Sequence, residues 1–287
     1  MKIPEPENEH WDLIIKPKNK WYQLDLGALW AYRDLLLLLV RRDFVSVYKQ
    51  TILGPLWFFI QPIITSLTFT FIFGSIAKIS TDGIPGILFY MAGITLWTYF
   101  ADCLNKTSNT FIANAGVFGK VYFPRLIIPL SVLVSNLIKL GIQLLIFICI
   151  WIYFLIYSNQ VLPHWQLMWM LPVLIFMMAG LGFGFGILIS SLTTKYRDLT
   201  FLIGFGVQLL MYGSSVVIPV SSMNGNVKFL MLLNPLTSII EAFKYIFLGS
   251  GFFDVYWLIY GFGFMLILIF FSVIIFNKVE KSFMDTV

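Results

Sequence analysis

The sequence has few charged residues and few of the side chains that usually carry chemistry. Only 11% of its 287 residues are Asp, Glu, Lys or Arg, whereas soluble domains average about 25%. It contains two cysteines, Cys103 and Cys149, and two histidines. This scarcity argues against a water-soluble fold, a disulfide framework and a cysteine-based metal site. The fold must therefore follow from the apolar residues, which make up 59% of the chain.

The apolar residues form segments that are long enough to cross a membrane. The mean hydropathy is +0.86, and a membrane helix needs about 20 apolar residues. We therefore predict an all-α integral membrane protein with six transmembrane helices. The predicted spans are residues 52–77, 84–101, 126–157, 167–192, 199–220 and 255–276.

The distribution of basic residues predicts the orientation, because Lys and Arg are retained on the cytoplasmic side of a membrane. If the N-terminus is cytoplasmic, all but four of the 19 basic residues lie in cytoplasmic segments. We therefore expect a cytoplasmic segment 1–51, a six-span domain 52–277 and a cytoplasmic tail 278–287. The net charge of +5 then needs no nucleic-acid partner. The four exceptions are Lys78, Lys139, Lys228 and Lys244.

The segment before the first span has the pattern of an amphipathic helix. Its apolar run is too short to cross a bilayer, and at 100° per residue its charged side chains gather on one side. This pattern predicts a helix in the cytoplasmic membrane interface. The helix serves either as a membrane anchor or as part of a substrate entrance. The entrance would be formed by Arg33, Arg41, Arg42 and Lys49.

Residues 221–254 lie on the outer side in this topology, yet they are strongly apolar. Asn234 followed by Pro235 is a typical helix start, and two glycines further on can end that helix. We predict two short re-entrant helices that enter the outer leaflet and return. The alternative, one more complete span, would bury Glu241 and Lys244 in the membrane.

Nucleotide-binding and catalytic patterns are missing. A phosphate-binding loop at Lys120 would require Gly at 114 and Ser or Thr at 121, where the chain has Asn114 and Val121. His10 and His164 fall on opposite sides of the membrane, so they cannot share a site. We therefore expect no catalytic residue and no metal site, and we expect an energy source in another subunit or an ion gradient.

Three further features concern residues in the spans and in the re-entrant segment. Lys139 lies in the middle of the third span, where it either forms a structural pair or lines a pore. Pairing with Asp102 is uncertain from the sequence, because Asp102 lies nearer the membrane surface. The alternating glycines of the fourth span, Gly182 and Gly186 among them, indicate close helix packing. Glu241 and Lys244, three residues apart, can form a local pair.

Four tracts together resemble a known family. They are residues 48–57, 114–125, 195–199 and 233–243. The chain is similar over about residues 25–280 to the permease subunits of ABC-2 type polysaccharide exporters, which export lipid-linked O-antigen, teichoic acid or capsule-type glycans.

The resemblance implies a half-transporter of the bacterial inner membrane. It would work with a second copy of itself and two copies of an ABC ATPase that binds ATP and magnesium, with no cofactor in this chain. Its substrate would be a polyprenyl-pyrophosphate-linked glycan, delivered through membrane lipid. The residues implied in ATPase coupling are Asn114, Gly116, Phe118, Lys120, Tyr196, Arg197 and Asp198. The pore or re-entrant candidates are Lys139, Asn234, Pro235, Glu241 and Lys244.

Other functions remain open at this point. The two cytoplasmic segments could be ordinary positive-inside loops rather than ATPase contacts. The same architecture could export a drug or a small lipid. An ion-coupled carrier should show interrupted spans with an ion site at the midplane, and a membrane glycosyltransferase should cluster carboxylates on one membrane face. Neither pattern is evident in this sequence.

Overall fold

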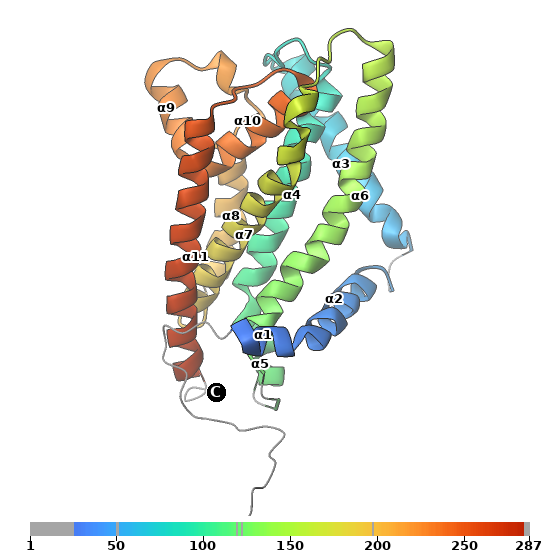
Figure 1. Cartoon of the computed structure of the whole chain (residues 1–287). Coiled ribbons are helices and arrows are strands. Elements are labelled where there is room, and N and C mark those ends of the chain that lie inside the picture. Colours follow the sequence, from blue (N-terminus) through green and yellow to red (C-terminus); the bar gives the residue numbers. More distant parts are fainter. Residues whose placement is uncertain (1–25, 50–51, 119, 122, 197, 284–287) are drawn as a thin grey trace, which may run out of the picture.

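The computed structural model describes residues 26–49, 52–118, 120–121, 123–196 and 198–283. These residues form a helical bundle along one long axis (Figure 1), and five of the helices are long and apolar enough to cross a membrane. This confirms the predicted all-α membrane protein. The bundle elements are α3 (Trp57–Phe69) continued by η2 (Thr70–Ile76), α4 (Gly86–Ser108), α6 (Ile127–Tyr157), η3 (Trp165–Met170) with α7 (Leu171–Thr193), α8 (Leu199–Tyr212) and α11 (Val255–Phe283).

Helix α4 is the centre of the bundle. In its apolar window 78% of the residues are buried, whereas in the span formed by α3 and η2 the share is 11%. A Cβ atom added at Gly182 or Gly186 of α7 would lie within 2.9 Å of Cys103 or Thr107 on α4. These glycines therefore allow α7 to approach α4 closely, as the sequence predicts.

One end of the bundle, which we call the basic end, is defined by two hydrogen bonds between distant segments. The Thr193 hydroxyl donates to the Ser108 carbonyl oxygen at 3.1 Å. Arg125 donates to the Glu280 carbonyl oxygen at 2.8 Å. The last turns of α4, α7 and α11 and the first turn of α6 therefore meet at this end.

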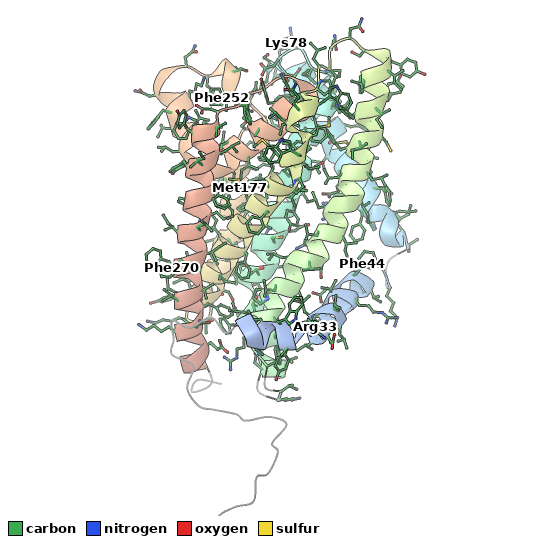
Figure 2. All side chains as sticks on the ribbon, viewed as in Figure 1. Arg33, Phe44, Lys78, Met177, Phe252 and Phe270 are labelled. Carbon is green, nitrogen blue, oxygen red and sulfur yellow. The ribbon has the colours of Figure 1, made fainter. Side chains whose placement is uncertain are left out.

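The opposite end, which we call the re-entrant end, is defined in the same way. The Ser221 hydroxyl donates to the Asp82 carboxylate at 2.6 Å. The backbone N–H of His164 donates to the Ile246 carbonyl oxygen at 2.9 Å. Together with the basic-end bonds, these contacts mean that the described chain passes six times between the two ends. Figure 2 labels Arg33 at the basic end and Lys78 at the re-entrant end.

The fifth passage differs from its prediction. A continuous helix was expected over residues 199–220, but α8 ends at Tyr212, and the chain continues without helical structure through buried Ser214 and Ser215. Non-helical backbone is tolerated at membrane depth only where protein supplies its hydrogen bonds. Here the Gly213 and Ser215 carbonyl oxygens accept bonds from Asn234 and Lys244.

The re-entrant segment consists of α9 (Gly225–Leu233) and α10 (Pro235–Leu248), which meet at an angle of 99°. The Asn234 side chain caps α10 by accepting from the Leu236 N–H at 3.1 Å, and Gly249 ends it with φ of +76°. Both flanks of the segment lie at the re-entrant end. This confirms two short helices that return, rather than another complete span.

Helices α1 (Leu26–Ala31) and α2 (Arg33–Tyr48) cross the basic end of the bundle (Figure 1). Leu39 and Val40 of α2 are buried, and Arg41 and Arg42 are exposed. The predicted amphipathic helix is therefore present. The remaining short elements are η1 (Gly54–Leu56), α5 (Thr110–Phe118) and η4 (Val220–Ser222).

Candidate functional site

The basic side chains of α2 do not form one cluster. Arg42 and Lys49 line an open pocket of about 300 Å³ together with Val45 and Ser46. Arg42 is also held by Asp43, whose carboxylate accepts from the Arg42 guanidinium at 2.7 Å. The structure therefore brings together two of the four proposed entrance residues.

The other two entrance residues lie outside that pocket. The Arg33 guanidinium lies 5.8 Å from the centre of the Trp30 ring and 4.0 Å from the Asp34 carboxylate. Arg41 is exposed beside Arg42. All four cations lie at the basic end of the bundle, and all are exposed rather than buried in the core.

Helix α5 forms a short projection at the basic end. Phe118, one of the implied coupling residues, is only 4% exposed and packs against Phe111 and Phe123. The Arg125 guanidinium lies 5.1 Å from the centre of the Phe118 ring, and burial lowers the pKa of Arg125 from its ordinary value. Phe118 therefore holds α5 to the bundle.

The surface of this projection is formed by the other residues. Val117 and Val121 are 43% and 58% exposed, and Gly116 and Lys120 are exposed as well. The Asn114 amide donates to the Thr110 carbonyl oxygen at 2.9 Å. An apolar surface with one cation is a suitable docking surface for a soluble partner.

The second implied coupling segment follows α7 at the same end. Tyr196 and Asp198 are exposed, and the Lys195 ammonium lies 5.2 Å from the centre of the Tyr196 ring. Arg197 lies outside the described residues. The last turn of α7 is tied to α4 at Ser108, immediately before α5, so the two segments that the resemblance implicates in coupling both lie at the basic end.

Inside the bundle, Lys139 forms a structural pair. Its ammonium donates to the Asp102 carboxylate at 2.7 Å, and the two side chains are 16% and 27% exposed. One turn further along α4, Lys106 donates to the Asn136 amide oxygen at 2.9 Å. The structure thus answers the question that the sequence left open about pairing of Asp102 with Lys139.

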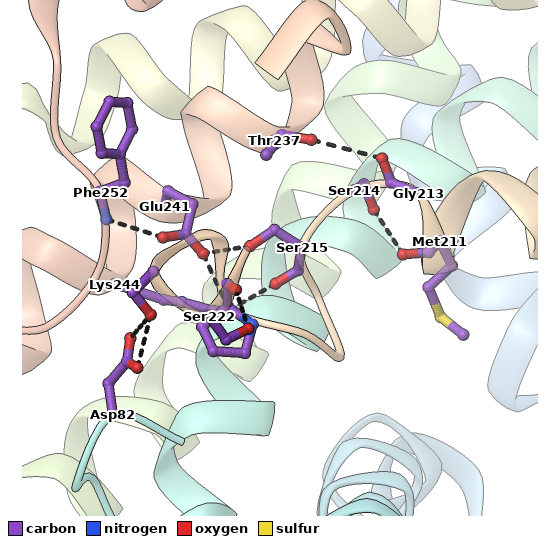
Figure 3. A network of polar contacts seen from close by, with 12 residues as sticks. Asp82, Met211, Gly213, Ser214, Ser215, Ser222, Thr237, Glu241, Lys244 and Phe252 are labelled. Carbon is purple, nitrogen blue, oxygen red and sulfur yellow. Dashed lines mark hydrogen bonds and ion pairs between the residues drawn. The ribbon is translucent and has the colours of Figure 1, made fainter. Parts of the chain in front are cut away.

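A second polar network fixes α10 at the re-entrant end (Figure 3). Glu241 and Lys244 have no exposed side-chain surface and lie 3.5 Å apart. The Ser215 hydroxyl and the Phe252 N–H donate to the Glu241 carboxylate. The Lys244 ammonium donates to the Ser215 carbonyl oxygen at 2.6 Å and lies 3.8 Å from the centre of the Phe89 ring. This network joins α10 to α4 and to the non-helical part of the fifth passage.

Sequence reasoning missed a polar group inside the spans. Gln61 of α3, Trp97 and Thr98 of α4, and Gln143 of α6 line one pocket. Isolated glutamines in otherwise apolar spans were the available signal. Among the described residues, no group of three or more His, Cys, Asp or Glu side chains could hold a metal ion.

The helical fold, with its basic end and its re-entrant end, is that of a membrane transport subunit. The sequence pattern of the ABC-2 type transporter family matches residues 34–248, which is most of the chain. The chain therefore belongs to this family. It is a membrane subunit with a transport role, and the family implies an ABC ATPase as its partner.

Three relatives match most of the chain. Two proteins of Klebsiella pneumoniae, each described as O-antigen export system permease protein RfbA, are 28% identical over 263 and 262 residues, covering 91% of this chain and 96% of the relative. A Myxococcus xanthus protein with the same description is 25% identical over 222 residues, which is 76% of this chain and 82% of the relative. These matches confirm the resemblance to polysaccharide export permeases.

Proposed function

We propose that this chain is the transmembrane subunit of an ATP-driven exporter that moves a lipid-linked polysaccharide from the cytoplasmic to the outer side of the bacterial inner membrane. The observation that carries the proposal is the similarity to O-antigen export permeases over 91% of the chain. The six passages and the re-entrant segment are compatible with one half of a transport path.

The proposed assembly contains two copies of this chain and two copies of the ABC ATPase, which supplies the ATP and magnesium site. The surface formed by α5, Lys195 and Tyr196 supports this proposal, because its exposed apolar and basic side chains lie together at the basic end. The α3 span, with 11% of its window buried, leaves an apolar face for a second copy or for lipid.

The proposed substrate is a polyprenyl-pyrophosphate-linked glycan, which would first meet the exporter at α2. Its anionic head must reach the membrane boundary while its tail stays in lipid. Arg41, Arg42 and Lys49 are exposed there, and an Arg guanidinium binds phosphate oxygens in a bidentate way. The rival role, attraction to anionic phospholipid, depends on charge alone.

Deletion of the gene in its bacterial host tests the proposed function. We expect loss of one surface polysaccharide and accumulation of its lipid-linked form in membranes, both reversed by the wild-type gene. Complementation with Arg41→Lys and Arg42→Lys together should restore export poorly if the guanidinium groups bind pyrophosphate. Unchanged surface glycan in the deletion strain, with altered drug or small-lipid export, would favour the alternative function.

A further inference from the structure

A polar pocket lies within the spans where four helices converge. It is lined by residues of α3, α4, α6 and α8 and has a volume of about 120 Å³. One water molecule requires about 10–15 Å³ of such space, so the pocket has room for several hydroxyl groups. Its lining residues are Gln61, Pro62, Thr65, Ile94, Trp97, Thr98, Gln143 and Met211.

Gln143 is the residue that marks this pocket as a binding site. The residue is only 2% exposed and lines the pocket, and no hydrogen bond joins its amide to another residue in the described part of the chain. An amide carries two donors and an acceptor, so Gln143 can offer hydrogen bonds to whatever occupies the pocket.

Two other polar side chains that line the pocket also make no hydrogen bond. Among the described residues, neither the Gln61 amide nor the Trp97 indole N–H has a hydrogen-bond partner. The Thr65 hydroxyl, by contrast, is used locally and donates to the Gln61 carbonyl oxygen at 2.8 Å. The pocket thus presents two amides and an indole to whatever occupies it.

Helix α3 is irregular where it borders the pocket. Pro62 lies inside the helix and lines the pocket, and it has no N–H to donate to the Phe58 carbonyl oxygen. The π-helix η2 (Thr70–Ile76) follows further along the same span, beyond the lining residues.

We propose that this pocket binds one sugar ring of the glycan during its passage. Hydroxyl groups of the ring bond to the Gln143 and Gln61 amides, and the apolar C–H face of the ring packs on Trp97, Ile94 or Met211. Amides both donate and accept, so they bind rings that differ in hydroxyl orientation. This inference rests on the proposed function and adds a sugar-binding position to it.

The test is ATP hydrolysis by the purified complex of this chain with its ATPase, stimulated by lipid-linked glycan extracted from the host. Gln143→Leu should raise the glycan concentration for half-maximal stimulation by about three- to tenfold, the effect of losing one to two neutral hydrogen bonds. The variant should melt at about the same temperature, because no hydrogen bond to another described residue is lost.

Controls separate this role from a structural one. Gln166→Leu, the same substitution at an exposed position outside the pocket, should leave the half-maximal concentration unchanged. If Gln143→Leu does not assemble, Gln61→Leu is measured in the same assay. The Gln61 side chain is exposed at the edge of the pocket, so its replacement should not affect assembly. A lower melting temperature with no change in the glycan concentration would overturn the proposal.

Polyprenyl pyrophosphate without sugar is the remaining probe. The shift caused by Gln143→Leu should be absent with this probe, and an equal shift would mean that the pocket does not bind sugar. If the glycan stimulates the wild-type complex and Gln143→Leu does not change the half-maximal glycan concentration, the pocket does not bind sugar and holds water instead. The proposed function would still stand. Absence of any wild-type stimulation by the glycan would overturn both.

Discussion

Two pairs of oppositely charged residues lie inside the bundle. Asp102 pairs with Lys139 between α4 and α6, and Glu241 pairs with Lys244 on α10. Ionised groups at membrane depth normally face protein or water and find a partner. The pairs let α6 and α10 keep charged side chains in an apolar surrounding.

The Asp102–Lys139 pair can be tested through its non-additivity. Asp102→Asn should lower the unfolding free energy by about 2–4 kcal/mol, because it leaves the Lys139 charge unpaired in the bundle. Asp102→Asn combined with Lys139→Met should recover most of that loss. The readout is thermal unfolding in detergent. A double variant as unstable as the single one would show that the two side chains act independently.

The sequence predicted one pair more readily than the other, for a geometric reason. Glu241 and Lys244 are three residues apart on one helix, so helical periodicity alone places them together. Asp102 and Lys139 belong to different helices, and their meeting depends on how α4 and α6 cross and on the reach of the lysine side chain. The Gln143 pocket depends on four helices, which is why periodicity gave no sign of it.

At the scale of elements, α5 has side chains in two different environments. Its buried aromatic residue, Phe118, attaches it to the bundle, while Val117 faces outward beside it. The segment was predicted to contact the ATPase because the resemblance to ABC-2 permeases implies it. The sequence could not separate the inward from the outward side chain, because that depends on how α5 packs against Phe111 and Arg125.

Substitution of adjacent residues on α5 separates docking from folding. Val117→Asp should remove most of the ATPase from the purified complex without changing the melting temperature, because it places a charge on an exposed apolar surface. Phe118→Ala should lower the unfolding free energy by about 3–5 kcal/mol, since it leaves a cavity in the core. Affinity purification and thermal unfolding measure the two effects. ATPase retention by Val117→Asp at the wild-type level would contradict docking at this surface.

Helix α8 shows where pattern reasoning about elements fails. Residues 199–220 are mostly apolar and carry no charged residue, so hydropathy predicts a continuous span, but the helix ends at Tyr212. The termination is stabilised by side chains of α10 and its cap, Asn234 and Lys244, which bond the freed carbonyl oxygens. Such long-range partners are not visible in the local sequence.

At the scale of the whole molecule, the two ends have different characters. The basic end has α2, α5, Lys195, Tyr196 and Asp198, and the re-entrant end has α9, α10 and the Asp82 loop (Figure 1). Hydropathy and basic residues predicted this division well, because both depend on the bilayer rather than on particular contacts. The orientation itself stays a prediction, with the basic end in the cytoplasm.

Cysteine labelling tests the orientation. In a background with Cys103 and Cys149 replaced by Ala, single cysteines at Asn226 or Gln160, both exposed at the re-entrant end, should react with an impermeant maleimide in intact cells. Cysteines at Tyr196 or Val121 should react only after permeabilisation. Labelling of Tyr196→Cys in intact cells would contradict the cytoplasmic placement of the basic end.

The most direct measurement of the central claim is glycan transport by reconstituted vesicles. The complex of this chain with its ATPase is placed in liposomes that contain lipid-linked glycan, and the glycan reaching the ATPase-free face is measured with a glycan-binding lectin. We expect accumulation that requires ATP and is abolished when the ATPase cannot hydrolyse it. Transfer at the same rate without ATP, or no transfer by an assembled and ATP-hydrolysing complex, would contradict the account.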